Sequence, residues 1–168
     1  MNSKKWKTWK AMMDDKICFT CKKMNGKIYD MNEKPNPTPP VHLFCRCIIT
    51  KLKSKMAGTA TALGVNGADW YLKMHNKLPD YYISVGDAKD QGWIPEEGNL
   101  AIQCPNKMIF GGMYMNRDGH LPSAPGRIWY EADICYVNGY RGVERIVFSN
   151  DGIIFVTYDH YRTFYEIV

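Results

Sequence analysis

The residues from Arg127 to Cys135 alternate polar and apolar side chains, as a half-buried β-strand does. One face of this strand would carry Glu131 and Asp133 in line, which is too polar a face for a protein core. Arg141 and Arg145 follow an Asn-Gly turn, so the returning strand can bring two guanidiniums beside these carboxylates. Taken alone, such a face is either solvated surface or a functional site.

His160 favours a functional site over plain solvated surface, because it lies in the last expected turn, between the final two strands. In an antiparallel sheet that turn can reach the face that carries Glu131. A carboxylate, an imidazole and two guanidiniums on one face favour cleavage of a phosphodiester by acid–base catalysis. No cluster of metal ligands accompanies them in sequence, so we expect no catalytic cofactor.

A second group of reactive side chains lies near the N-terminus. Cys18 and Cys21 have a two-residue spacing, and His42, Cys45 and Cys47 follow after a proline-rich loop. Soft ligands at these spacings are typical of a structural zinc site, with four of the five residues as ligands. Two disulfides or free thiols are the alternatives.

The elements that would position these residues change character along the chain. Helical spacing and capping signals predict helices over residues 68–75, from Ser84 to Gly92, and after Gly98-Asn99. A period of two then predicts strands over 108–115, 127–136, 143–149, 153–158 and 163–168. We therefore expect an α+β fold, in which short helices pack on a C-terminal antiparallel sheet.

Charge divides the chain of 168 residues into two parts of opposite sign. Residues 1–58 carry +9 and residues 59–168 carry −4, which together give the net charge of +5. A small, polar run over 54–62 is typical of a linker. We therefore predict a basic Cys/His-rich module over 1–58 and a catalytic domain over 59–168. This division argues against one uniformly basic nucleic-acid-binding domain.

Apolar segments are short throughout. No stretch approaches the roughly 18 apolar residues of a membrane span, and Met1–Lys10 is polar and basic, unlike a secretory signal. We expect a soluble monomer with no membrane partner.

Residues from about 68 to 168 resemble the barnase-like, guanyl-preferring microbial ribonucleases. The motifs that carry the resemblance are Lys77-Leu78-Pro79-Asp80, Gly92-Trp93, Gly98-Asn99-Leu100-Ala101, Asn116-Arg117-Asp118-Gly119, Leu121-Pro122, Gly126-Arg127-Ile128-Trp129, Glu131-Ala132-Asp133-Ile134, Arg141, Arg145-Ile146 and Asp159-His160-Tyr161-Arg162-Thr163-Phe164. They occur in the family's order and spacing, and the resemblance covers about three fifths of the chain.

This resemblance implies a role for each catalytic candidate. Glu131 matches the general base and His160 the general acid, while Arg141 and Arg145 match the cations that stabilise the transition state. The implied reaction is metal-independent cleavage of single-stranded RNA after guanosine, through a 2′,3′-cyclic phosphate that is then hydrolysed. Asp133 matches the residue that orients the two arginines.

The same resemblance assigns substrate-binding residues. Asn116, Arg117 and Asp118 match the guanine-recognition loop, and Tyr161 matches a residue that lines the substrate pocket. The family usually has glutamate where Asp118 stands. It also places a catalytic lysine near the start of the second helix, where this chain has Val85. Val85 therefore keeps open an alternative, a weak or inactive ribonuclease fold that serves as an RNA- or protein-binding module.

Residues 6–50 are similar to the end of the phage Mu F-like head-morphogenesis proteins. The resemblance rests on Cys18-Phe19-Thr20-Cys21 and on His42-Leu43-Phe44-Cys45-Arg46-Cys47, with Trp9, Gly26 and Pro39-Pro40 between and around them. Such domains can precede toxin domains. We therefore expect a delivered or extracellular ribonuclease toxin that acts in the cytoplasm of a target cell. Its partners would be RNA and an acidic, barstar-like inhibitor.

Overall fold

The chain forms two compact units in the computed structural model, which describes residues 5–168. The first unit contains the residues up to Ser54 together with 116–126. The second contains residues 55–115 and 127–168. Segment 116–126 connects two strands of the second unit but groups with the first. None of the helices within residues 5–168 is long and apolar enough to span a membrane.

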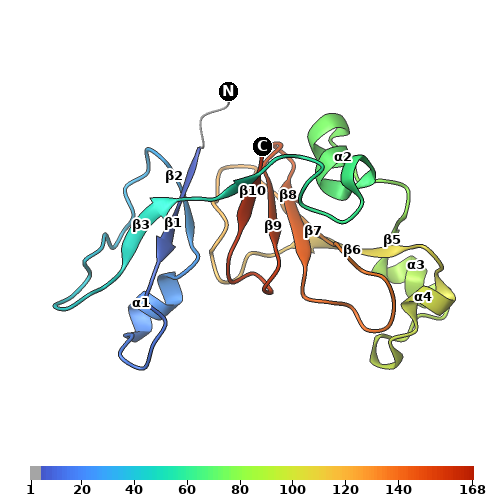
Figure 1. The fold of residues 1–168 in the computed structure, drawn as a ribbon, viewed down its shortest axis with the longest axis horizontal. Coiled ribbons are helices and arrows are strands. Elements are labelled where there is room, and N and C mark those ends of the chain that lie inside the picture. Colours follow the sequence, from blue (N-terminus) through green and yellow to red (C-terminus); the bar gives the residue numbers. More distant parts are fainter. Residues whose placement is uncertain (1–4) are drawn as a thin grey trace. The chain divides into compact units, whose positions relative to one another are not determined.

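The first unit is built on a three-stranded antiparallel sheet with the order β2-β1-β3 (Figure 1). Its elements are β1 (Trp6–Lys10), α1 (Phe19–Met24), β2 (Ile28–Asp30) and β3 (Ile48–Lys51). Thr8 of the central strand pairs with Ile28 on one side and Thr50 on the other. This sheet was not anticipated from the sequence.

A small core holds the first unit together. It consists of Trp9, Ala11, Cys21, Met24, Tyr29 and Cys47. Trp9 is 1% exposed and Tyr29 2% exposed, so the central strand and its neighbour β2 both contribute large buried rings. The buried cysteines belong to this core, and the state of their sulfur atoms therefore bears on the packing of the unit.

The second unit contains a seven-stranded sheet with the order β4-β10-β9-β8-β7-β6-β5. Its strands are β4 (Ser54–Lys55), β5 (Tyr82–Ser84), β6 (Met108–Tyr114), β7 (Trp129–Asp133), β8 (Arg145–Ser149), β9 (Ile154–Thr157) and β10 (Tyr165–Ile167). β6 to β10 occur where the period of two predicts them. β5 adds a parallel pair with β6, which the sequence analysis did not predict.

The helices of the second unit are α2 (Ala68–His75), α3 (Val85–Asp90) and α4 (Leu100–Gln103), with 3₁₀ turns over Gly64–Asn66 and Pro95–Glu97. α2 buries Ala68 and Leu72 in one core with strand residues such as Ile146 and Val156. α3 and α4 form a separate core with Trp93 and Ile109. Short helices packed on a largely antiparallel sheet confirm the expected α+β class.

The run over residues 54–62 is ordered rather than loose. Asp69, which is fully buried, accepts hydrogen bonds from the backbone amides of Gly58 and Ala60 at 2.8 and 2.9 Å. Its other oxygen accepts from the Thr61 hydroxyl at 3.1 Å. A buried carboxylate with three donors fixes this run against the start of α2.

Candidate active site

Asp133 and the two arginines form the most buried part of the polar face. Asp133 on β7 pairs in register with Arg145 on β8, and its carboxylate is almost fully buried. Oδ2 accepts from Arg141 Nε at 2.7 Å, while Oδ1 accepts from Arg141 Nη2 at 2.6 Å and lies 3.2 Å from Arg145 Nε. One carboxylate therefore orients both guanidiniums, as the resemblance implied.

The two guanidiniums differ in their remaining partners. Arg145 Nη1 donates to the carbonyls of Gly142 and Glu144 at 2.8 and 2.7 Å, and its side chain is 9% exposed. Arg141 is 28% exposed and lies over the Trp93 ring at 6.0 Å. The hydrogen bonds that Arg141 donates to the Asp133 carboxylate raise the pKa of Arg141. Both cations are permanently charged and held in fixed directions, which suits the binding of a phosphate.

Glu131 lies on the same face of β7, and a β-bulge in β6 makes room for it. The register of β6 against β7 shifts between Phe110 and Gly112, which leaves Gly111 as the extra residue. A Cβ atom on Gly111 would lie 2.8 Å from Glu131 Oε1. Only glycine therefore leaves the Glu131 carboxylate in its observed position.

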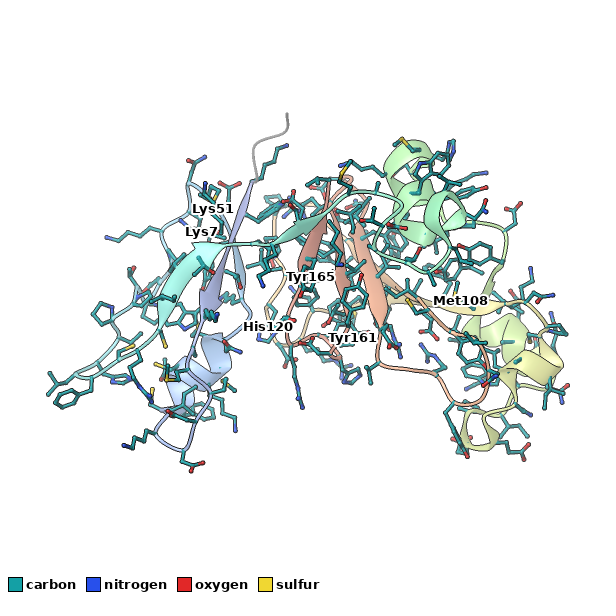
Figure 2. All side chains as sticks on the ribbon, viewed as in Figure 1. Lys7, Lys51, Met108, His120, Tyr161 and Tyr165 are labelled. Carbon is teal, nitrogen blue, oxygen red and sulfur yellow. The ribbon has the colours of Figure 1, made fainter. Side chains whose placement is uncertain are left out.

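Tyr161 connects Glu131 to His160. The Tyr161 hydroxyl donates a short hydrogen bond to Glu131 Oε2, and the ring centroids of Tyr161 and His160 lie 5.1 Å apart. Burial, followed by the contact with Glu131, raises the pKa of Tyr161. Its ring stacks on Tyr114 of β6 at 5.0 Å. Figure 2 labels Tyr161 in the turn after β9.

The turn that carries His160 has an unusual backbone. His160 and Tyr161 have φ angles of 57° and 66°, which are uncommon for residues other than glycine. Asp159 stabilises this conformation, since its Oδ1 accepts from the Thr163 amide at 2.8 Å and its Oδ2 from the Thr163 hydroxyl at 2.7 Å. Burial of Asp159 opposes ionisation, but these hydrogen bonds prevail and lower its pKa. Such conformations concentrate at functional sites.

The four catalytic candidates, Glu131, Arg141, Arg145 and His160, all belong to the second unit. Electrostatic coupling links Arg141 to both Glu131 and Tyr161, and the Tyr161 ring adjoins His160. The His160 side chain is exposed, as a proton donor to a bound substrate must be.

The candidate base-recognition residues lie in the other unit. Asn116 uses its side chain to close the loop: Nδ2 donates to the Leu121 carbonyl at 2.9 Å, and Oδ1 accepts from the Leu121 amide at 3.0 Å. Arg117 and Asp118 are exposed between these anchors. The Asn116 side chain therefore holds the loop closed. The side chains of Arg117 and Asp118 are the ones exposed to solvent.

Val85 begins α3 and packs against the core that contains Trp93. The preceding Ser84 caps the helix, with its Oγ accepting from the Asp87 amide at 3.1 Å. This position therefore offers no cation to a substrate. Elsewhere in this unit Arg127 and Asp151 form an ion pair at 2.8 Å.

The five metal-ligand candidates of the first unit gather around Cys21. Its Sγ lies 3.3 Å from His42 Nε2 and 3.8 Å from Cys45 Sγ. Cys18, Cys21 and His42 form one group of possible ligands, and Cys21, Cys45 and Cys47 form another. A cavity of about 20 Å³ adjoins Cys18, Cys21, His42 and Cys47.

The thiols of this cluster differ in their readiness to ionise. Burial opposes ionisation of Cys45, but hydrogen bonds from the Val41 and Cys47 amides lower its pKa to about 6. Burial raises the pKa of Cys21. The donor set of sulfur and imidazole nitrogen fits a soft, tetrahedral metal ion.

Four residues that support this site were not among the predicted site residues. Gly111 and Tyr114 shape the surroundings of Glu131 and Tyr161, Trp93 covers Arg141, and Asp159 holds the His160 turn. Signals existed for Trp93 and Asp159, which stand in the motifs that carry the family resemblance, and Asp159 is also typical of a turn residue. The bulge at Gly111 depends on how β6 pairs with β7, so the sequence of β6 alone does not specify it.

Comparisons with known proteins give two family matches. The family model for ribonuclease matches residues 67–168, and the model for phage Mu protein F like protein matches residues 1–50. A ribonuclease of Heyndrickxia coagulans is 48% identical over 102 residues, which cover 61% of this chain and 94% of that protein. Ribonucleases of Bacillus intermedius and Bacillus pumilus are also 48% identical over 102 residues, which cover 61% of this chain and 63% of each. Since the ribonuclease model matches more than half of its length, this chain belongs to the ribonuclease family.

Proposed function

We propose that the chain is a metal-independent endoribonuclease that cleaves single-stranded RNA after guanosine. The observation that carries this proposal is that Tyr161 contacts Glu131 and lies beside His160, while Asp133, on the same face of β7 as Glu131, holds two guanidiniums. The names of its relatives and the family match support the same activity class.

In the proposed first step, the Glu131 carboxylate takes the proton of a ribose 2′-hydroxyl. The 2′-oxygen then forms a bond to phosphorus as the bond from phosphorus to the 5′-oxygen breaks, and His160 gives its proton to that leaving oxygen. The product is a 2′,3′-cyclic phosphate. Water opens this ring in the second step, with the two residues exchanging roles. Because the 2′-hydroxyl is the nucleophile, the reaction requires RNA and excludes DNA.

Arg141 and Arg145 would stabilise the charge that develops on the phosphate oxygens. Fixed donors directed at developing charge are often the largest catalytic contribution, and Asp133 fixes both guanidiniums before substrate arrives. Val85 leaves this site with one cation fewer than the family pattern. We therefore expect a slower enzyme, and the alternative remains a ribonuclease fold that binds RNA or protein without cleaving.

Cleavage of RNA by the purified chain in excess EDTA distinguishes these functions. Glu131→Gln and His160→Ala should each lower the rate by at least about 100-fold, as loss of a general acid or base does. His75→Ala is the matched control, since His75 is an exposed residue at the end of α2. Unchanged cleavage in both site variants would refute the assigned mechanism. Activity that EDTA abolishes would instead point to a metal nuclease.

Guanine preference is assigned to the loop of Asn116, Arg117 and Asp118. Backbone amides of the loop would donate to the base oxygen, and the Asp118 carboxylate would accept from the base N–H groups. Asp118→Asn should reduce the ratio of guanosine to adenosine cleavage at least about tenfold, because one charged acceptor is lost. An unchanged ratio would remove Asp118 from base recognition.

A structural zinc ion is proposed for the first unit, held by four of Cys18, Cys21, His42, Cys45 and Cys47. In a tetrahedral zinc site two sulfur ligands lie about 3.8 Å apart, and a sulfur and a histidine nitrogen lie about 3.6 Å apart. The Cys21 sulfur lies 3.8 Å from Cys45 Sγ and 3.3 Å from His42 Nε2, close to these separations. Elemental analysis should find one zinc per chain, retained in Cys135→Ser and lost in Cys21→Ser. Disulfides would instead give a metal-free chain with few titratable thiols.

The biological role proposed is that of a delivered toxin behind a phage-type module, acting on RNA in the cytoplasm of a target cell. Bacteria expressing the chain should stop growing, while bacteria expressing Glu131→Gln should not. An acidic, barstar-like inhibitor would present carboxylates to Arg141 and Arg145 and block cleavage. Failure of such a protein to inhibit would exclude it as the partner.

A further inference from the structure

The loop over residues 116–126 is closed on itself by Asn116. Two hydrogen bonds connect the Asn116 side chain to the main chain of Leu121, and the Gly119 amide donates to the Asn116 carbonyl at 2.9 Å. Leu121 is 2% exposed, so the loop is anchored at that residue by burial as well. These hydrogen bonds fix the conformation of the turn. None of them involves the backbone carbonyl of His120.

The partner of this carbonyl comes from a distant part of the sequence. The backbone amide of Ile28 in β2 donates to the His120 carbonyl at 2.8 Å, and both residues belong to the first unit. His120, whose carbonyl accepts this hydrogen bond, is labelled in Figure 2. A β-strand has hydrogen-bonding groups on both edges. The other edge of β2 pairs with β1, so this amide lies on the edge that faces the loop.

The donor is fixed by the packing of the N-terminal sheet. Ile28 is 2% exposed, and its neighbour Tyr29 lies in the core with Trp9 and Cys21. The Trp9 amide donates to the Lys27 carbonyl at 2.9 Å, directly before Ile28. A donor on a packed sheet holds its acceptor more firmly than a donor on a mobile loop does, since less conformational freedom remains.

We propose that β2 positions the base-recognition loop, with the Ile28 amide as the positioning group, so that the N-terminal module controls which nucleotide the ribonuclease selects. This inference rests on the proposed function of the loop. Recognition by loop amides requires that those amides be preorganised, and a loop braced at His120 loses less entropy on binding. The module would therefore be part of the substrate-binding apparatus as well as an appendage.

Amide hydrogen exchange on the full chain tests the bracing without reference to activity. Ile28→Pro removes the donor, while Ile28→Val keeps it and changes the side chain by one methylene. We expect exchange at the Gly119 and Leu121 amides to accelerate roughly fivefold or more in Ile28→Pro and less than twofold in Ile28→Val. The Trp9 amide reports whether the module itself has opened.

Two results support the proposal and one overturns it. Faster loop exchange with Trp9 still protected assigns the bracing to this single hydrogen bond. Faster exchange at both the loop amides and the Trp9 amide assigns the bracing of the loop to the module as a whole. Loop amides that exchange as in the wild type, whatever the state of Trp9, would overturn the proposal.

Steady-state kinetics then separate positioning from a structural effect. With guanosine- and adenosine-containing dinucleotides, Ile28→Pro should raise the KM for the guanosine substrate and lower the selectivity ratio roughly fivefold, with kcat little changed. Partial unfolding alone would lower kcat for both substrates and leave their ratio intact, which would contradict positioning. Failure of the wild type to cleave RNA would refute the proposed function, but hydrogen exchange would still decide whether β2 braces the loop.

Discussion

Replacing Asp133 with asparagine separates two effects that a buried carboxylate between two guanidiniums can have. The substitution keeps the shape of the side chain but removes its charge and replaces one acceptor oxygen with a donor. Asp133 presently accepts both bonds from Arg141, at 2.7 and 2.6 Å, and lies 3.2 Å from Arg145. Neither arginine would keep its present orientation.

The cost in stability follows from burial. Removing one partner of a buried ion pair costs about 3–5 kcal/mol, because the other charge stays desolvated and unpaired. Arg145 is 9% exposed and has little access to water, whereas Arg141 is 28% exposed and can turn toward it. We therefore expect the free energy of unfolding to fall by about 3 kcal/mol, at the lower end of that range. Urea denaturation measures this change.

The kinetic consequence combines two effects, one on KM and one on kcat. Loss of the carboxylate leaves one more net positive charge near the phosphate, which attracts the bound substrate and the transition state alike and so lowers KM without raising kcat. Misplacing the two guanidiniums costs about 100-fold in the chemical step. Asp133→Asn should therefore lower kcat about 100-fold while KM stays the same or falls. Initial rates on a guanosine-containing dinucleotide measure both constants.

Asp151→Asn is the matched control for these measurements. Asp151 also pairs with an arginine, Arg127 at 2.8 Å, but its side chain is 45% exposed. An exposed pair contributes about 0–1 kcal/mol, so this variant should retain its kcat and nearly all its stability. The reasoning is wrong if Asp133→Asn keeps the wild-type kcat, or if it costs no more stability than the control.

Three further predictions concern the residues around the site and the N-terminal cluster. Gly111→Ala should displace the Glu131 carboxylate and lower kcat at least about tenfold, because the new Cβ would lie 2.8 Å from Oε1. Gly86→Ala is the control: its Cβ would come no closer than 3.9 Å to its neighbours, so this variant should keep the wild-type rate. Asp159→Asn should loosen the histidine turn and destabilise the fold by about 1.5–3 kcal/mol, as loss of hydrogen bonds to a charged group does. Because the folded pKa of Asp159 is lowered, its contribution is present above the unfolded pKa of about 3.9 and disappears as the pH falls through the folded pKa. The stability difference between wild type and Asp159→Asn should therefore shrink on acidification, and a difference that stayed constant or grew would contradict this account. Chelation of the proposed zinc should lower the melting temperature of the first unit, as followed by tryptophan fluorescence, and a chain whose unfolding a strong chelator does not affect would have no structural metal.

Much of the second unit could be predicted from its sequence because local signals agree with the tertiary structure. The span predicted for the first helix is the observed span of α2, Ala68–His75, and β6 to β10 occur where a period of two is bounded by turn residues. β5 was missed because it has only three residues and pairs in parallel with β6. The sheet of the first unit was missed because its short strands are separated by long loops, and only their pairing makes them recognisable.

Some features of the candidate site could likewise be predicted from the sequence, and others could not. Alternation along β7 predicts that Glu131 and Asp133 share a face, and an Asn-Gly turn predicts the return of Arg145 beside them. The left-handed backbone of His160 depends instead on the hydrogen bonds that Asp159 accepts, and the space around Glu131 depends on a bulge in the neighbouring strand. The bulge arises from strand pairing and the turn from side-chain hydrogen bonds, neither of which the periodicity of the sequence reports.

Product analysis on a defined, guanosine-containing oligoribonucleotide in excess EDTA tests the central claim most directly. The acid–base mechanism of Glu131 and His160 predicts fragments that end in a 2′,3′-cyclic phosphate, followed slowly by a 3′-phosphate, and no cleavage of the matching deoxyribonucleotide. Fragments that carry a 5′-phosphate, cleavage of the deoxyribonucleotide, or no cleavage without added metal would contradict it.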